Sequence, residues 1–286
     1  MKIFIALLFT LALFGERLND LALQKIELLE QNSSKSFAFA FVGDNRGGCK
    51  IYQKILKKIN QDREIAFIIN GGDLVPNGYK KQYKSYLECV KISKKPIINI
   101  IGNHEVKWSK GERYFEKFIG DRYFSFSFKD AYFIVLDTSN QKALDKEQLS
   151  WLKKELNLSL KFKYRFIFMH TPLYDPREGV LKVGHSLKDS NQAKELNLLF
   201  KRYRVNLLFC SHIHLFFDGE WRGVKFIISG GGGAPLYYYK DRAFFHYIKV
   251  DVNSSSFDYK VIKIDAQEKP KWRWILQRAG EYLNIW

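Results

Sequence analysis

Five apolar segments of this chain each end in residues that can bind a metal ion or exchange a proton. The segments are FAFAFVGD, IAFIINGGD, PIINIIGNHE, RFIFMH and VNLLFCSHIH, and each has the composition of a buried strand. Their polar residues are Asp44, Asp73, Asn103 with His104, His170, and His212 with His214. In an open α/β sheet the carboxyl ends of the strands meet at one crevice, so we expect these side chains to lie together. Oxygen and imidazole ligands suit divalent metals, and the sequence therefore predicts a metal site.

Amphipathic segments separate these strands and predict helices between them. Ile51, Ile55 and Ile59 recur at the spacing of one helical face, and residues 80–93 repeat the pattern. From Gly223 onward the chain is rich in strand-forming residues. Successive strand–helix units predict a largely parallel sheet, and the late strands predict a second sheet packed on it. We expect one α/β domain, a four-layer α-β-β-α sandwich with two mixed sheets flanked by helices, over residues 37–265.

The composition is that of a globular protein with a strongly basic charge balance. The chain has 286 residues, of which 46% are hydrophobic, and its formal net charge is +17. Such a surplus favours anionic partners, namely phosphate-bearing substrates, nucleic acid or an anionic membrane surface. Lysines are scattered along the predicted helices, so a basic solvated exterior is the simpler explanation of the charge.

The cysteine content argues against a disulfide scaffold or a thiolate zinc site. The chain has three cysteines, an odd number without CxxC spacing. Cys210 lies within an apolar strand and reads as a buried thiol. Cys49 follows the first predicted ligand loop and could approach the site.

Both ends of the chain carry apolar segments with a separate interpretation. The run from Ile3 to Phe14 has the length of a signal-peptide core, so residues 1–15 predict a leader and export to the periplasm or outside the cell. An uncleaved leader would leave the protein membrane-associated, and a first strand or helix of the domain is the alternative. Residues 266–286 predict a helix with an aromatic stripe that packs on the domain, with membrane-surface attachment as its alternative. No other segment is long enough to span a membrane.

The order of the five motifs resembles that of the calcineurin-like metallophosphoesterase family. The motifs are GD, GGD, GNHE, MHTP and SHIH, each following a strand, and the family pattern is D-x-H, GD-x-x, GNH-D/E, a lone H and GH-x-H. The resemblance spans roughly residues 37–265. It implies two divalent ions, Mn, Fe or Zn, that activate water for attack on a phosphomonoester or phosphodiester.

The resemblance also implies a role for each ligand. One ion would be held by Asp44, Asp73 and His214, and the other by Asp73, Asn103, His170 and His212. Asp73 would bridge the two ions. Asn103 would also contact the substrate, and His104 would protonate the leaving oxygen or stabilise its charge.

The first motif departs from the family pattern at its third residue. Here the motif reads Asp44-Asn45-Arg46, and Arg can only donate hydrogen bonds. Water, Asn45 or the substrate could fill the missing ligand position, or the first ion could bind weakly. A planar guanidinium suits bidentate contact with phosphate, so we expect Arg46 to bind substrate and assist catalysis. The alternative is an arginine paired with a loop carboxylate.

Three further features complete the candidate site. His185, with Arg177 nearby, lies in the loop that follows His170 and is expected to contact substrate. The glycine run at 230–233 predicts a close backbone approach, and His246 reads as structural. Hydrolysis of a small phosphate ester is the favoured function. A catalytically weak anion-binding protein and a nuclease are the alternatives, while the substrate and the oligomeric state are left open.

Overall fold

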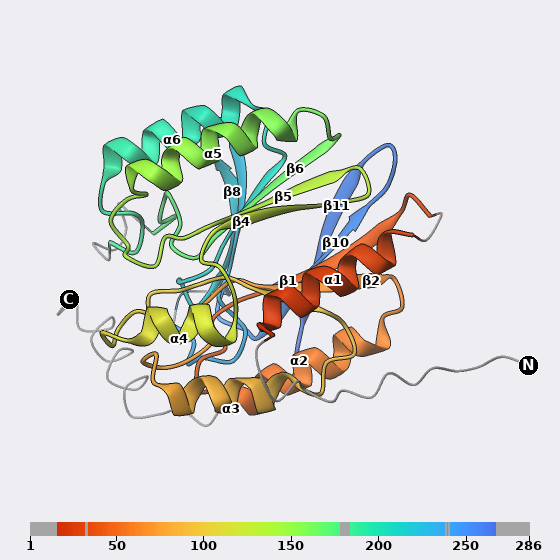
Figure 1. The fold of residues 1–286 in the computed structure, drawn as a ribbon, viewed down its shortest axis with the longest axis vertical. Coiled ribbons are helices and arrows are strands. Elements are labelled where there is room, and N and C mark those ends of the chain that lie inside the picture. The colour runs from red at the N-terminus through yellow and green to blue at the C-terminus, as the bar shows by residue number, and fades with distance from the viewer. Residues whose placement is uncertain (1–15, 32–33, 178–183, 238, 240, 267–286) are drawn as a thin grey trace, which may run out of the picture.

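Two mixed β-sheets pack face to face, and helices cover their outer faces (Figure 1). The computed structural model describes residues 16–31, 34–177, 184–237, 239 and 241–266. The expected leader and nearly all of the expected tail helix lie outside these residues.

The first sheet brings together the strands of the first three motifs. Strands β1, β2 and β3 run parallel, while β10 is antiparallel to both β1 and β11. Helices α2, α3 and α4 pack on its outer face. In sheet order the strands are β11 (Phe257–Lys263), β10 (His246–Val252), β1 (Phe37–Val42), β2 (Ile65–Asn70) and β3 (Ile97–Asn99), and the helices are α2 (Cys49–Gln61), α3 (Lys80–Val90) and α4 (Gly111–Phe118).

The second sheet carries the strands of the two histidine motifs. Its four central strands run parallel, and an antiparallel strand closes each edge. Helices α5 and α6 cover its outer face. In sheet order the strands are β4 (Phe124–Phe128), β5 (Ala131–Leu136), β6 (Tyr164–Met169), β7 (Leu207–Cys210), β9 (Val224–Ser229) and β8 (Phe216–Trp221), and the helices are α5 (Lys146–Ser159) and α6 (Ser190–Arg202).

The predicted α-β-β-α sandwich is confirmed, but its strands are distributed differently from the expectation. The late strands do not form a sheet of their own. Strands β8 and β9 extend the second sheet, and β10 and β11 extend the first. Each pair is an antiparallel ribbon that can bond to an exposed sheet edge without a crossover helix.

The alternation of side chains along β1 shows how one strand serves two cores. Phe37, Phe39 and Phe41 face the second sheet, where the Phe39 ring meets the Phe133 ring edge-on with centroids 5.4 Å apart. Ala38 and Ala40 point to the other side, against the helices. Successive side chains of a strand point to opposite faces, so large residues fill the space between sheets and small ones admit the helices.

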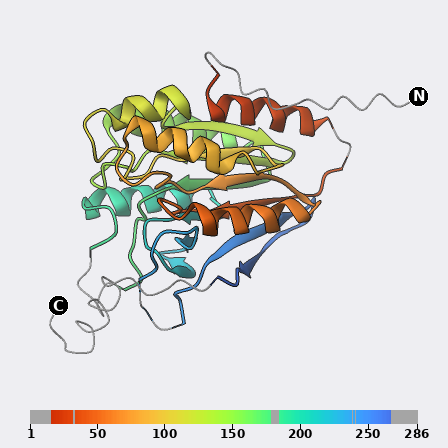
Figure 2. The same ribbon diagram turned by 90° about the horizontal axis from the view of Figure 1, so that it is seen from below.

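Helix α1 (Leu18–Glu30) lies beside the sheets rather than in the outer layers (Figures 1 and 2). Ala22 and Ile26 bury against the core between the sheets. The Asn19 side chain accepts a hydrogen bond from Asn99 N at 2.8 Å and donates to Asn99 O at 2.9 Å. These bonds satisfy backbone groups of the edge strand β3 and so fix the helix there.

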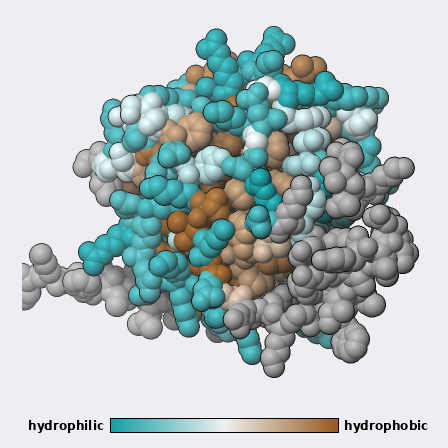
Figure 3. Space-filling view, turned by 180° about the vertical axis from the view of Figure 1, so that it is seen from behind, coloured by the Kyte–Doolittle hydropathy of each residue, from teal (hydrophilic) through white to brown (hydrophobic). Residues whose placement is uncertain are grey.

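The surface is mainly hydrophilic on the side opposite to Figure 1, around a hydrophobic area near the centre of the view (Figure 3). Within the described part of the chain, no helix has the length and apolar character needed to cross a bilayer.

A disulfide bond joins Cys49, the first residue of α2, to Cys89 near the end of α3. Cys49 could have offered a thiol to the site, but its sulfur is bonded to Cys89 instead. Cys210 is a buried free thiol, as predicted. Pairing of Cys49 with Cys89 depends on the packing of α2 against α3, which the cysteine spacing does not encode.

Candidate metal centre and active site

The five motifs come from both sheets and meet at one edge of the sandwich. Asp44, Asp73 and Asn103 follow strands β1, β2 and β3 of the first sheet. His170 directly follows β6, and His212 follows β7 of the second sheet. The predicted grouping at the carboxyl ends of the strands is therefore observed, although two sheets supply it rather than one.

Close contact between the two sheets brings these loops together. A Cβ atom on Gly43 would lie 2.0 Å from Oγ of Ser211, and one on Gly71 would lie 2.1 Å from the same atom. Only glycine therefore allows the first-sheet loops to approach Ser211. The glycine run contributes a similar approach, since Gly232 N donates to Gly43 O at 2.8 Å, which confirms its predicted role.

Three ligand residues occupy the left-handed region of backbone conformation. The φ angle is 61° at Asp44, 55° at Asp73 and 69° at His212. Residues other than glycine rarely adopt such angles, and they persist where the surroundings hold them. Here a backbone bond from Asp44 N to Gly72 O, 3.0 Å long, and a bond from His212 N to the Asp44 side-chain oxygen Oδ2, 2.8 Å long, hold the loops together.

The first group of ligands surrounds Nε2 of His170. Asn103 Oδ1 lies 3.0 Å from this nitrogen, Asp73 Oδ1 lies 3.3 Å from it, and His212 Nδ1 lies 3.3 Å from it. We name these four residues the His170 group. All four were predicted as ligands of one ion, and the structure brings them together.

The hydrogen bonding of the His170 group fits a bound cation. His170 Nδ1 donates to Gly71 O at 2.9 Å, which leaves the lone pair of Nε2 facing the other ligands. This lone pair and the oxygens of Asp73 and Asn103 then face one another, an arrangement that a cation stabilises. Burial lowers the pKa of His212 well below its usual value, so its ring is neutral and able to ligate.

The second group consists of Asp44, Asp73 and His214, which we name the His214 group. One ligand atom from each lies within 4.8 Å of the others, and all three side chains are buried. Asp44 Oδ1 has no hydrogen-bond partner among the described residues. Burial alone would raise the pKa of Asp44, but neighbouring His214, His170 and Arg46 lower it below the usual value.

Arg46 reaches into the His214 group from the first motif. Its Nη2 lies 3.2 Å from His214 Nε2, and its Nη1 lies 3.4 Å from Asp73 Oδ2. Asn45, one of the alternatives for the missing ligand position, is engaged in other hydrogen bonds. Its side chain is buried on the other side of the loop, where Oδ1 accepts from Asn70 Nδ2 at 2.8 Å.

His104 lies beside the ligands, and Glu105 supports them from behind. His104 Nδ1 is 2.5 Å from Pro76 O, and its Nε2 is 3.8 Å from Asp73 Oδ2. Burial lowers the pKa of His104. Glu105 is buried and accepts from the backbone amides of Gly102, Asp73 and Val75 at 2.7, 2.9 and 2.9 Å.

Glu105 is a supporting residue to which the sequence reasoning gave no role. Its two oxygens tie the loop after β3 to the loop after β2, and so position two motifs at once. Burial and the charge of Asp73 raise its pKa to about 8, against the effect of the three amides. The available signal was the acidic residue that directly follows GNH.

Tyr237 forms one wall of the site and was also missed. Its ring stacks on that of His214 with centroids 4.8 Å apart, and the His185 ring lies 5.8 Å from it. The predicted site residue His185 is therefore near the centre, with its ring 5.5 Å from that of His212. Arg177 donates to Asp175 at 2.9 and 2.8 Å and is held by that carboxylate.

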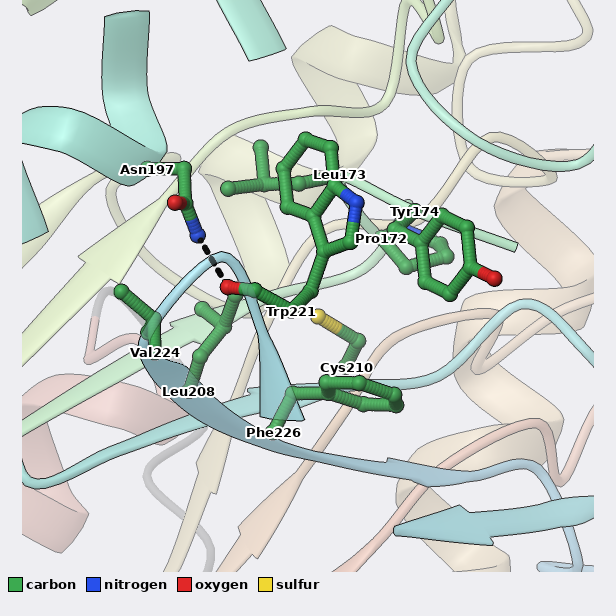
Figure 4. Close-up of a pocket in the computed structure, with 9 residues that line it drawn as sticks. All are labelled: Pro172, Leu173, Tyr174, Asn197, Leu208, Cys210, Trp221, Val224 and Phe226. Carbon is green, nitrogen blue, oxygen red and sulfur yellow. Dashed lines mark hydrogen bonds between the residues drawn. The ribbon is translucent and has the colours of Figure 1, made fainter. Parts of the chain in front are cut away.

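A small apolar pocket lies elsewhere, between the second sheet and α6 (Figure 4). In Figure 4 the side chains of Tyr174, Cys210 and Trp221 border it, and Asn197 donates to Trp221 O at 3.0 Å. None of the candidate ligand residues lines this pocket, so the pocket is separate from the candidate metal centre.

The family described as "Calcineurin-like phosphoesterase" matches residues 37–216, which is more than half of the chain. The chain belongs to the calcineurin-like phosphoesterase family. The matched segment contains all five motifs of this chain, from Asp44 to His214.

Curated proteins similar to this chain include two bacterial proteins described as probable phosphodiesterases. A probable cyclic nucleotide phosphodiesterase of Rhodopseudomonas palustris is 26% identical over 188 residues, which are 61% of this chain and 66% of the relative. A probable glycerophosphodiester phosphodiesterase of Arcobacter nitrofigilis is 27% identical over 183 residues, or 61% of this chain and 66% of the relative. The chain therefore matches just under two thirds of the length of each relative.

Solved structures similar to this chain support its fold. A purple acid phosphatase from yellow lupin has a TM-score of 0.65 at 18% identity, covering 80% of this chain and 52% of the lupin chain. The Plasmodium protein GAP50 has a TM-score of 0.61 at 15% identity, and the match covers 86% of this chain and 94% of the GAP50 chain.

Proposed function

We propose that this protein is a metal-dependent hydrolase of small phosphate esters, with phosphodiesters as the first candidates. The observation that carries the proposal is the convergence of Asp73 Oδ1, Asn103 Oδ1 and His212 Nδ1 on His170 Nε2. Family membership supports the reaction class, and the two bacterial relatives, both described as probable phosphodiesterases, support the choice of phosphodiesters.

The His170 group is proposed to hold a divalent ion of the Mn, Fe or Zn type. An ion there supplies Lewis-acid polarisation of a phosphoryl oxygen and makes a water nucleophile available near neutral pH. The neutral amide of Asn103 ligates without adding negative charge, so the ion stays electrophilic.

The chain's own residues orient the ester and handle its charge. Arg46 donates its guanidinium N–H groups to phosphoryl oxygens, a geometry that suits its planar fork. Asn103, whose Oδ1 faces His170, is left with its Nδ2 to donate to the same group. Because Nδ1 of His104 is bonded to Pro76 O, its Nε2 is the nitrogen available to the substrate, and this nitrogen lies beside Asp73. In its protonated form, Nε2 donates a proton to the leaving oxygen.

Turnover of aryl esters tests the proposal. Protein stripped with EDTA is supplied with Mn²⁺, Zn²⁺ or Fe²⁺ and assayed on bis(4-nitrophenyl) phosphate and 4-nitrophenyl phosphate. We expect turnover only with metal, and its loss in a folded His170→Asn variant. Saturable phosphate binding without turnover under any metal would support the anion-binding alternative instead.

Nuclease activity is the third alternative, and salt dependence tests it. A nuclease of this charge would bind DNA with an affinity that falls steeply as salt rises. We expect cleavage of the aryl diester to exceed cleavage of single- or double-stranded DNA at equal substrate concentration. The reverse ranking would favour the nuclease.

Export to an oxidising compartment is part of the proposal. It is supported by the apolar run Ile3–Phe14 and by the Cys49–Cys89 disulfide, a bond that is rare in reducing compartments. Fusion of residues 1–36 to a reporter that folds only after export tests the leader, and an inactive fusion would contradict it. Thiol alkylation of protein from its native host, with and without reductant, tests the bond.

A further inference from the structure

The two ligand groups share Asp73 but differ in what already occupies them. The His170 group presents lone pairs to one another, whereas the His214 group already contains the guanidinium of Arg46. This difference, which deepens the proposed function and rests on it, bears on how many ions the centre holds.

Arg46 uses the lone pair that a metal would need. His214 Nδ1 donates to Pro235 O at 2.6 Å, so the lone pair of the ring lies on Nε2. That nitrogen accepts an N–H from Arg46 Nη2 at 3.2 Å. A divalent ion ligated by His214 would have to displace this contact and the 3.4 Å ion pair between Arg46 and Asp73.

The backbone around Arg46 keeps the side chain in place. Arg46 N donates to Asp73 O at 2.9 Å, and Asp44 O accepts from Ala234 N at 2.7 Å. The Asn45 side chain also anchors the loop by donating to Leu74 O at 3.3 Å. The guanidinium is mostly buried, with 19% of the side chain exposed.

Charge balance favours the same outcome. The buried carboxylates of Asp44 and Asp73 face one permanent cation before any metal binds. An ion in the His170 group shares Asp73 and adds two positive charges. A second dication beside Arg46 would then meet like charges at close range, where burial leaves little screening.

We propose that Arg46 replaces the first metal, so that the centre is mononuclear. One divalent ion binds in the His170 group, and the Arg46 guanidinium neutralises Asp44 and Asp73 in the His214 group. Arg46 then presents to the phosphoryl group the positive charge that a second ion would otherwise supply.

Metal counting by mass spectrometry, with Mn²⁺ as the probe, tests the proposal on the full chain. We expect one Mn²⁺ per wild-type chain with the EPR spectrum of an isolated ion. We expect two in Arg46→His, with the exchange coupling of ions about 3.5–4 Å apart. Two coupled ions in the wild type, or one ion in both proteins, would overturn the assignment of Arg46 while leaving the proposed function intact. No bound Mn²⁺ in either protein would overturn both.

A matched pair of histidine variants tests the same point without altering Arg46. His212 and His214 lie two positions apart in one loop, but only His212 belongs to the His170 group. We expect His212→Asn to weaken Mn²⁺ binding more than about 100-fold, because removal of an outer-shell partner alone costs 10–100-fold. We expect His214→Asn to keep the wild-type count and to stay within about threefold in affinity. An equal loss in both variants would contradict the mononuclear centre.

Discussion

Nη2 of Arg46 lies 3.2 Å from Nε2 of His214, the nitrogen that a D-x-H centre would offer to its first metal. The contact makes His214 an acceptor for a guanidinium, and it places a permanent positive charge beside Asp73. Arg46 is therefore central to the expected phosphate binding as well as to the metal count.

Removal of the Arg46 charge is expected to weaken phosphate binding. Hydrogen bonds to charged groups contribute about 1.5–3 kcal/mol, so Arg46→Gln should raise the inhibition constant of inorganic phosphate by roughly 10- to 150-fold. Competitive inhibition of aryl diester hydrolysis measures it. Arg242→Gln is the control, because Arg242 pairs with Asp218 on the far edge of the second sheet. An unchanged inhibition constant in Arg46→Gln would show that Arg46 does not contact phosphate.

The decrease in hydrolysis rate on removal of the His104 side chain is expected to depend on the leaving group. A general acid contributes about 10²- to 10⁴-fold to rate, and it matters most when the leaving oxygen is basic. His104→Gln should therefore slow phenyl phosphate esters much more than 4-nitrophenyl esters, with metal content unchanged. A plot of kcat against leaving-group pKa measures this. Parallel plots for variant and wild type would count against His104 as the proton donor.

Glu105→Gln is expected to destabilise the fold. Above its pKa of about 8, the ionised Glu105 accepts three backbone amides, whereas a Gln amide would turn an N–H group toward these donors, so the comparison is made at a pH above 8. Leaving buried donors unpaired costs about 1–3 kcal/mol, which urea unfolding can resolve. Glu220→Gln on the exposed part of β8 is the control. A loss no larger than that of the control would mean that Gln replaces these bonds.

His246 is expected to make the stability pH-dependent. Burial lowers its pKa to about 4, although its bond to Phe244 O acts in the opposite direction. The folded chain binds this proton more weakly than the unfolded chain. The contribution of neutral His246 to the free energy of unfolding is therefore complete above about pH 6.5. As the pH falls toward 4, the free energy of unfolding decreases by about 3 kcal/mol. Urea unfolding between pH 4 and 7 measures the slope, and His246→Asn should flatten it. An equally steep slope in the variant would assign the effect to other groups.

The sequence predicted the sandwich and the grouping of the candidate ligand residues because both depend on local patterns. The five strands read as buried runs, and each ligand stands within a few positions of a strand end, as at Asp44 and His170. Strand pairing depends on contacts far apart in the chain, so the placement of β10 beside β1 could not be read from either segment.

Three further features depended on the same long-range packing, two in the site and one outside it. Tyr237 reaches His214 from a loop with no motif of its own, and Cys49 meets Cys89 only because α2 packs on α3. The composition of the first motif showed that Arg46 cannot ligate a metal. Its position between Asp73 and His214 required the folded geometry.

Anomalous scattering from crystals equilibrated with Mn²⁺ tests the central claim most directly. We predict a single anomalous peak per chain, bounded by Asp73, Asn103, His170 and His212, with the Arg46 guanidinium still beside His214. A peak between Asp44 and His214, or the absence of any peak at His170, would contradict the account.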